Sequence, residues 1–374
     1  MMHIVFISNE YPTWAPGGKG TFIQTFAREL VKVGHRVTVL GIGDKKTEEQ
    51  LKDEEVLLIR LRKPISPKAT YIENSLRINS RLNKIHKEHA ISIVETSELD
   101  CAYLPKNTPF KKVIRLHGGH HFFAEGEQRG FNPIKARREK KSFANADAFI
   151  AVSKYVKDHT AKFLSYHTKP IAIINYPIDT DILIPEVKIN PDKIVFAGTV
   201  CEKKGVFQLI EAFQLVKEKH PSKQLEIFGR DWFYPTGNSY IKMLTETFSE
   251  KQLSAVTFHG AIPRDRLYKE YASSLFCIFP SHMETQGLVT LEAMLMEKPV
   301  VFSIYGPGPE TIDHMHTGLL SDVRNPKDIA EKMLWCINNQ AAAQSMGKKG
   351  RKAVLKKFDK KTILAKNIKF YQSL

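Results

Sequence analysis

The sequence lacks any long apolar run. No stretch of about 18 uncharged apolar residues occurs in its 374 residues, so no membrane-spanning helix is predicted. The opening residues, MMHIVFISNEYPTW, do not follow the basic, apolar and small-residue order of a secretory signal peptide. Cysteine is scarce, and the scattered positions exclude a disulfide framework or a zinc site. We therefore expect a cytoplasmic protein whose cysteines are reduced packing residues: Cys101, Cys201, Cys277 and Cys336.

Acidic residues are outnumbered by basic ones. Lys and Arg total 56 against 40 Asp and Glu, which gives a formal net charge of +16. This excess favours an anionic partner, which can be nucleic acid, an acidic lipid surface or a phosphorylated substrate. A generally lysine-rich surface accounts for part of the charge. No recognised nucleic-acid-binding motif occurs, so we expect no nucleic-acid partner, and a basic nucleic-acid-binding protein stays as an alternative.

A strand, loop, helix and strand follow one another near the start of the chain. HIVFIS and HRVTVLGIG are predicted strands, and TFIQTFARELVKVG between them has helical spacing, with apolar residues at Phe22, Phe26, Leu30 and Val33. The pattern restarts near residue 190 with DKIVFAG, the helix VFQLIEAFQLVKEKH and the strand QLEIFGR. Such units predict parallel sheets.

The length and this repeat predict two domains of similar size. The fold class is α/β, with two Rossmann-like domains whose parallel sheets face across a cleft. We place the N-terminal domain at 1–187 and the C-terminal domain at 188–355. The final segment, 356–374, is an amphipathic helix that packs on either domain or crosses back to the first. Ligands of such sheets bind beyond the carboxyl ends of the strands.

The segment PSHMETQGLVTLEAM follows a predicted strand and carries two glutamates with seven residues between them. Glu284 falls in a loop, and Glu292 in the second turn of the helix that follows Gly287. The free amides at that helix start, near Leu288, form a natural diphosphate site. The two carboxylates can accept hydrogen bonds from hydroxyl groups on either side. The alternative is that Glu284 caps the helix and Glu292 is a surface charge.

Three further groups follow strands. Gly17 and Gly18 lie in a glycine loop that we expect to contact a ligand and not to form a simple turn. His117 precedes two glycines and can point into the cleft, or it can be a structural histidine. Lys204 precedes Gly205 at a place where an ammonium group can meet a diphosphate, or it can be solvated. His120 and His121 have no further ligand at a suitable spacing, so we predict no metal site.

These residues together resemble a known family over essentially the whole chain, the retaining GT-B glycosyltransferases of the "glycosyl transferases group 1" type. PSHMETQGLVTLEAM resembles the P-S-x-x-E-x-x-G-x-x-x-x-E-A-M signature. PGGKGTFIQTFARELVKVGHRVTVL resembles the glycine loop, helix and G-H-x-V strand of that family, and NADAFIAVS, EKKG and EKPVVFSIYGPGPETI resemble three further stretches.

The resemblance implies a role for each matching residue. Glu284 would hold the hydroxyls of the transferred sugar, Glu292 the ribose, and Lys204 the diphosphate. His117 would contact the donor sugar near its anomeric carbon. The remaining donor contacts would come from Gly17, Gly18, Thr199, Gly287, Leu288 and Glu310.

The chain departs from the family at two positions. Thr199 stands where an arginine usually anchors the diphosphate, with Lys203 or Arg230 as substitutes, and Gln286 replaces an aromatic residue.

The implied reaction is transfer of a sugar from a nucleoside-diphosphate sugar to a saccharide acceptor. A UDP-sugar is favoured over a GDP-sugar, the anomeric configuration is retained, and neither a metal nor another cofactor is required. A sugar-nucleotide epimerase on the same fold is the alternative enzyme.

The basic run FNPIKARREKKSF, with the aromatic HHFF before it, predicts contact with an anionic bilayer at the inner face of the cytoplasmic membrane. We therefore expect a lipid-linked acceptor, in cell-surface polysaccharide or lipopolysaccharide biosynthesis. A solvated helix face is the alternative for these residues: Lys135, Arg137, Arg138, Lys140 and Lys141.

Overall fold

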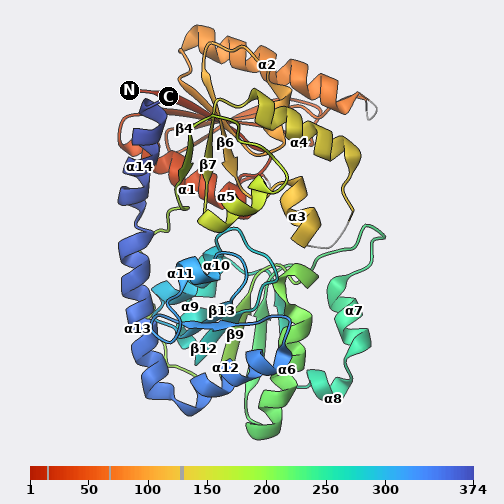
Figure 1. Cartoon of the computed structure of the whole chain (residues 1–374), viewed down its shortest axis with the longest axis vertical. Helices are drawn as coiled ribbons and strands as arrows, with labels where there is room; N and C mark the ends of the chain where they lie inside the picture. Colours follow the sequence, from red (N-terminus) through yellow and green to blue (C-terminus); the bar gives the residue numbers. More distant parts are fainter. Residues whose placement is uncertain (15–16, 67–68, 127–129) are drawn as a thin grey trace. The chain divides into compact units, whose positions relative to one another are not determined.

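The computed structural model describes residues 1–14, 17–66, 69–126 and 130–374. The chain forms two compact units (Figure 1). The first unit comprises Met1–Pro177 together with Lys360–Leu374, and the second comprises Ile178–Asp359. The corresponding boundaries predicted from the sequence are 187/188 and 355/356.

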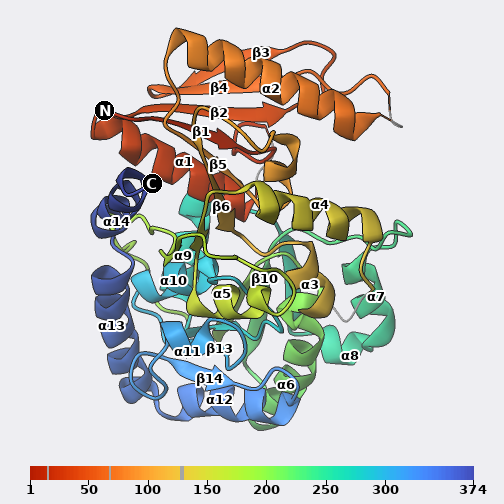
Figure 2. The ribbon, with the colours of Figure 1, turned by 45° about the horizontal axis from the view of Figure 1, so that its top comes forward.

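The described residues of the first unit build an eight-stranded sheet in the order β3-β4-β2-β1-β5-β6-β7-β8. Neighbouring strands are parallel except for β3 and β4, which form an antiparallel hairpin at one edge. Figure 2 shows β3, β4, β2 and β1 side by side. The strands are β1 (His3–Ile7), β2 (Arg36–Ile42), β3 (Glu49–Asp53), β4 (Val56–Leu61), β5 (Ile93–Thr96), β6 (Lys111–Leu116), β7 (Ala148–Ala151) and β8 (Ile171–Ile173).

Helix α1 (Gly18–Lys32) buries one apolar face, as its spacing predicts. Phe22, Phe26 and Leu30 are buried, and Gly34, at a φ of +86°, follows the end of the helix. Val33 was expected on the same face, but it is the C-cap residue and is exposed. The other helices of this unit are α2 (Thr70–Glu88), α3 (His120–Gly126), α4 (Pro133–Asn145), α5 (Lys154–Ala161), α14 (Lys360–Gln372) and the short η1 (Asp100–Tyr103).

The C-terminal helix α14 belongs to the first unit and packs beside α1 (Figures 1 and 2). A buried polar cluster joins it to the sheet. Arg115 of β6 donates to both carboxylate oxygens of Glu95 on β5, at 2.7 and 2.9 Å, and to the Asn367 side-chain oxygen at 2.7 Å. Tyr371 of α14 donates to the same carboxylate. Asn367 and Tyr371 of the last helix therefore supply hydrogen bonds to the buried ion pair of Arg115 and Glu95.

In the second unit the described residues form a six-stranded parallel sheet in the order β11-β10-β9-β12-β13-β14. Its strands are β9 (Lys193–Ala197), β10 (Gln224–Phe228), β11 (Val256–Gly260), β12 (Phe276–Phe279), β13 (Val300–Ser303) and β14 (Leu319–Ser321). Its helices are η2 (Glu202–Lys204), α6 (Val206–Lys219), α7 (Tyr240–Thr247), α8 (Glu250–Leu253), α9 (Arg264–Ser273), α10 (Leu288–Leu295), α11 (Gly308–Thr311), α12 (Pro326–Asn338) and α13 (Gln340–Lys357).

The central strands of both sheets are fully buried runs of apolar residues, such as β1 and β12. Such runs are typical of parallel sheets that are covered by helices on both faces. All four cysteines are buried and unpaired. Within the described ranges, no helix has both the length and the apolar character needed to cross a bilayer.

Candidate functional site

The segment after β12 has the layout that the signature predicts. Glu284 lies in the loop, Gly287 is the N-cap of α10, and Glu292 is in the second turn of that helix. Gly287 has a φ of +77°, and a Cβ there would lie 2.8 Å from the Phe302 ring, so glycine is needed for both reasons. Among the described residues, no side-chain hydrogen bond caps the helix. The first amides of α10 are therefore available to an anionic ligand.

Glu284 forms an ion pair with Lys204, from the short η2 turn that follows β9. The two side chains are mostly buried, at 14% and 18% exposure. Gly205, with a φ of +69°, lets the two loops pack closely, since a Cβ there would lie 2.0 Å from the Pro280 carbonyl oxygen. The residue predicted to bind the sugar hydroxyls, Glu284, and the residue predicted to bind the diphosphate, Lys204, are thus in direct contact.

Glu292 is only 6% exposed and pairs with Arg264, the first residue of α9. The Arg264 Nη2 lies 2.6 Å from the Glu292 Oε1. Burial raises the pKa of Glu292, and the charge of Arg264 opposes that rise. The alternative in which Glu284 caps the helix and Glu292 is a surface charge is therefore wrong.

Arg264 was missed because nothing in IPRDRL marks it as a ligand. The one available signal was its place just after the strand AVTFHG, at the carboxyl edge of the same sheet. Helix α9 packs against α10, the next helix along the chain, and this packing brings the guanidinium to Glu292.

The other residues of the second unit that are predicted to bind the sugar donor come after the ends of its strands. Thr199 follows β9 and is half-buried, after Gly198 with its φ of +143°. Leu288 is the first residue of α10 and is half-buried. Glu310 lies in the first turn of α11, and its carbonyl accepts a hydrogen bond from Lys357. Because the strands are parallel, these ends share one edge of the sheet.

In the first unit, His117 follows β6 and is held by aromatic neighbours. Its Nδ1 is hydrogen-bonded to the Tyr176 hydroxyl, and the two rings stack with centroids 5.6 Å apart. Phe22 contacts both rings. Burial, with Lys19 and Arg115 nearby, lowers the pKa of His117 well below its usual value. At neutral pH the imidazole is uncharged, which suits a hydrogen bond to a sugar hydroxyl.

The two histidines after His117 have structural partners. His120 and His121 donate their backbone amides to Glu139, at 2.7 and 3.0 Å, and the His121 ring also contacts that carboxylate. A Cβ at Gly119 would lie 1.7 Å from a Glu139 oxygen, so the loop can close around the carboxylate only with glycine. Within the described ranges, no group of three His, Cys, Asp or Glu side chains is arranged to hold a metal ion.

Glu98, which the sequence analysis missed, lies beside this loop. Its side chain is buried, and within the described part of the chain its Oε1 has no hydrogen-bond partner. Burial and the nearby Glu139 raise the pKa of Glu98 to about 8. A carboxyl group of this kind is protonated at neutral pH and can donate a hydrogen bond.

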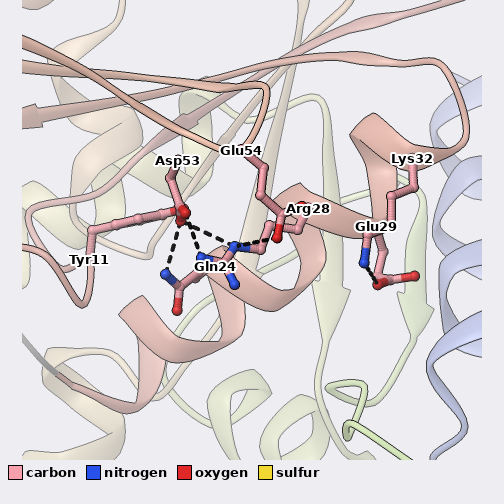
Figure 3. Close-up of polar contacts among 7 residues, drawn as sticks. All are labelled: Tyr11, Gln24, Arg28, Glu29, Lys32, Asp53 and Glu54. Atoms are coloured by element: carbon pink, nitrogen blue, oxygen red, sulfur yellow. Dashed lines mark hydrogen bonds and ion pairs between the residues drawn. The ribbon is translucent and has the colours of Figure 1, made fainter. Parts of the chain in front are cut away.

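Asp53 joins Tyr11, which precedes the glycine loop, to helix α1 (Figure 3). The Asp53 carboxylate accepts from the Tyr11 hydroxyl at 2.6 Å, from Gln24 at 2.9 Å and from Arg28. These bonds hold the segment before the loop against α1 and the β3–β4 hairpin. Gly17 is the extended N-cap of α1, and Gly18 begins the helix. The two preceding residues of the predicted loop, at 15 and 16, lie outside the described residues.

The basic run forms α4, and its five cations are not equivalent. Arg138 is half-buried: it donates to the Leu99 carbonyl at 3.0 Å and lies over the Tyr103 ring at 4.1 Å. Lys141 donates to the Tyr71 hydroxyl at 3.2 Å while staying exposed. The other three are exposed: Lys135, Arg137 and Lys140.

Comparisons with known proteins agree with this architecture. The family model described as "Glycosyl transferases group 1" matches residues 179–353, and "Glycosyltransferase Family 4" matches residues 16–182. An uncharacterized glycosyltransferase of Methanocaldococcus jannaschii is 28% identical over 73% of this chain and 71% of its own length.

Several solved structures cover the whole chain, including the following two. Sucrose-phosphate synthase of Thermosynechococcus elongatus has a TM-score of 0.85 at 21% identity, with 99% of that chain covered. HepE of Anabaena, in complex with UDP-glucose, has a TM-score of 0.76 at 17% identity, with 100% of that chain covered. The likeness confirms the expected GT-B fold class. With family models matching both units, the chain belongs to the glycosyltransferases of group 1.

Proposed function

We propose that this glycosyltransferase transfers a sugar from a nucleoside-diphosphate sugar, with a UDP-sugar favoured over a GDP-sugar, and that it retains the anomeric configuration. The observation that carries the proposal is the open N-terminus of α10 between two carboxylates, each held by a cation. The UDP-glucose bound to the structural neighbour HepE supports the choice of donor class.

In the second unit, Glu284 accepts hydrogen bonds from the hydroxyls of the sugar, and Glu292 from the ribose. As the glycosidic bond breaks, negative charge develops on the diphosphate. Lys204 and the amides at Leu288 stabilise that charge, which is the role of preorganised donors in such a step. Thr199, Gly287 and Glu310 make further contacts with the sugar donor. This arrangement supplies the positive charge from the chain itself, so we propose that no metal ion is required.

In the first unit, neutral His117 donates or accepts a hydrogen bond with the donor sugar, and Gly17 and Gly18 border the phosphates. No carboxylate is assigned as a covalent nucleophile. The acceptor hydroxyl attacks on the face from which the diphosphate leaves, and the departing phosphate oxygen takes the acceptor proton. The new glycosidic bond then has the configuration of the old one.

A screen of nucleoside diphosphates and nucleotide sugars by thermal shift tests the donor. We expect stabilisation by UDP and one UDP-sugar without added metal and in the presence of a chelator. The anomeric configuration of the product by NMR tests retention. An inverted product, or binding that needs a divalent cation, contradicts the respective part of the proposal.

We also propose that the acceptor is a lipid-linked saccharide at an anionic membrane surface, in the synthesis of a cell-surface polysaccharide or lipopolysaccharide. Beside the basic side chains of α4, Phe131 is 47% and Ile134 78% exposed. On α2, Ile72 and Leu76 are 63% and 67% exposed. Helices α2 and α4 both pack on η1. Exposed apolar side chains among cations are typical of surfaces that enter the headgroup region of a bilayer.

Vesicle flotation tests this surface. Replacing the cations Lys135, Arg137, Lys140 and Lys141 by Glu should abolish flotation with anionic vesicles. The matched control places the same four charge reversals on α13, at the exposed Lys348, Lys349, Lys352 and Lys356. Equal loss in both variants would indicate a net-charge effect, and equal flotation with neutral vesicles would contradict a role for anionic lipid.

A further inference from the structure

One face of α9 is directed at Glu292. Arg264, Tyr268 and Tyr271 recur at spacings of four and three residues, which places them on the same side of the helix. Helix α9 packs against α10, where Glu292 lies. The Arg264 guanidinium lies 5.7 Å from the centre of the Tyr268 ring, and its Nη2 donates to Glu292. Burial, with Glu292 nearby, raises the pKa of both tyrosines, so both stay protonated.

Arg264 differs from the other residues of this cluster in its exposure to solvent. Tyr271 is completely buried, and its hydroxyl has no hydrogen-bond partner in the described part of the chain. Arg264 instead keeps 38% of its side chain exposed while it contacts the buried Glu292. It therefore reaches from the surface to a buried acid. Within the part of the chain that the structure describes, the hydrogen bond from Arg264 engages one oxygen of Glu292, at 2.6 Å.

We propose that Arg264 is a positioning residue for the donor: it holds Glu292 as a charged, oriented acceptor whose second oxygen is left for the ribose hydroxyls. This inference rests on the proposed function and adds a residue to it. Arg264 itself need not touch the donor. Its guanidinium suits the task because the planar group stays charged under all conditions and can lie over the Tyr268 ring while it pairs.

The physical reason is the burial of Glu292. A carboxylate in such surroundings favours its protonated form, and a cation in contact restores the charged one. Hydrogen bonds to a charged acceptor are roughly twice as strong as neutral ones. The titratable groups that act on Glu292 are on α9: Arg264, Tyr268 and Tyr271. Of the other elements packed on α10, β12 contributes the buried Cys277, and α13 contributes Arg351, which donates to the Leu295 carbonyl.

The test compares Arg264→Met with Arg264→Lys, using UDP and GDP as probes in calorimetry from about pH 5.5 to about pH 8.5. The wild type should bind one of them with an affinity that changes little over this range. Arg264→Met should bind about 10-fold more weakly near neutral pH, with a deficit that shrinks as pH rises and Glu292 ionises. Arg264→Lys should recover much of the affinity. With saturating donor, kcat should stay within about twofold.

Three further variants make the result decisive. Arg266→Met, on the exposed face of the same helix, should bind like the wild type. Glu292→Gln should bind weakly at every pH, and adding Arg264→Met to it should cost nothing more. Arg264→Met that binds as tightly as the wild type, or that is weakened equally at all pH values, overturns the inference. A wild type that binds no nucleoside diphosphate overturns the proposed function instead.

Discussion

Lys204 and Glu284 form an ion pair although 80 residues separate them in the chain. One comes from the turn after β9 and the other from the loop after β12, two strands that are neighbours in the second sheet. Two residues with separate predicted roles are thus joined in one ion pair. Because an ammonium has three N–H donors and a carboxylate two acceptor oxygens, each residue keeps hydrogen-bonding capacity for a ligand while the pair is formed.

The first prediction concerns this pair. Lys204→Met should lower kcat by about 10²–10³-fold, because the charge on the departing diphosphate loses a preorganised cation. Glu284→Gln should lower it as well, and the double variant should lose much less than the product of the two effects, since the residues act as a unit. Steady-state kinetics with the identified donor measures this.

Lys327→Met, at an exposed position on α12, is the control and should leave the rate unchanged. Fully multiplicative losses in the double variant would contradict the coupling.

A second prediction concerns the turn before α10. Gly287→Ala should destabilise the protein by about 1–3 kcal/mol, because alanine is strained at positive φ and its Cβ would press on Phe302. The affinity for the donor should fall with it, since the helix start moves. Gly130→Ala, where a Cβ meets nothing within 4 Å, should be neutral. Chemical denaturation and calorimetry measure both, and equal stability of the two variants would refute the argument.

A third prediction follows from Glu98. Its pKa is raised to about 8 in the folded protein from an ordinary value of 4.5. The folded state therefore holds a proton that the unfolded state has released, and the resulting stability is lost as pH rises from about 4.5 to about 8. The slope is at most about 1.4 kcal/mol per pH unit. Glu98→Gln should flatten this part of the stability profile.

Thermal unfolding at a series of pH values between these limits measures the effect. Glu331→Gln, at an exposed glutamate, should keep the wild-type profile. A Glu98→Gln profile with the wild-type slope would show that Glu98 is ionised in the folded protein.

A fourth prediction concerns the buried charge at the C-terminal helix. Arg115→Met should cost about 3–5 kcal/mol, because Glu95 is left buried without its main partner. Replacing both residues by Met should cost less than the single change, since no unpaired charge remains. Denaturant unfolding of the two variants measures the difference, and a double variant that is less stable than Arg115→Met would be the contrary result.

The sequence predicted the elements whose burial leaves a clear pattern. The apolar runs of β1, β9 and β12 and the periodic face of α1 appear at their expected places, and the signature gave the start of α10. Neither strand of the β3–β4 hairpin was predicted. VLLIRL is a mostly buried apolar run that was overlooked, whereas EQLKD is a polar edge strand that covers no core. Charged edges of this kind protect a sheet from pairing with other chains.

The partners of the predicted residues could not be read from the sequence. Arg264, Glu98 and Arg115 act through contacts between distant elements, and no local spacing marks such contacts. The sequence does not show whether a given lysine or arginine is buried or exposed. Only the packing of α9 on α10, or of α14 on α1, shows which of them is paired.

The order in which the chain is made has a consequence for biogenesis. Lys360–Leu374 emerges from the ribosome after the entire second unit, which at about 5–20 residues per second takes on the order of 10 s or more. Throughout that interval the nascent first unit has Arg115 without Asn367 and Tyr371, and α1 without its covering helix. The first unit can therefore be completed only after the second unit has been translated, and chaperones that shield incomplete domains can act during that interval.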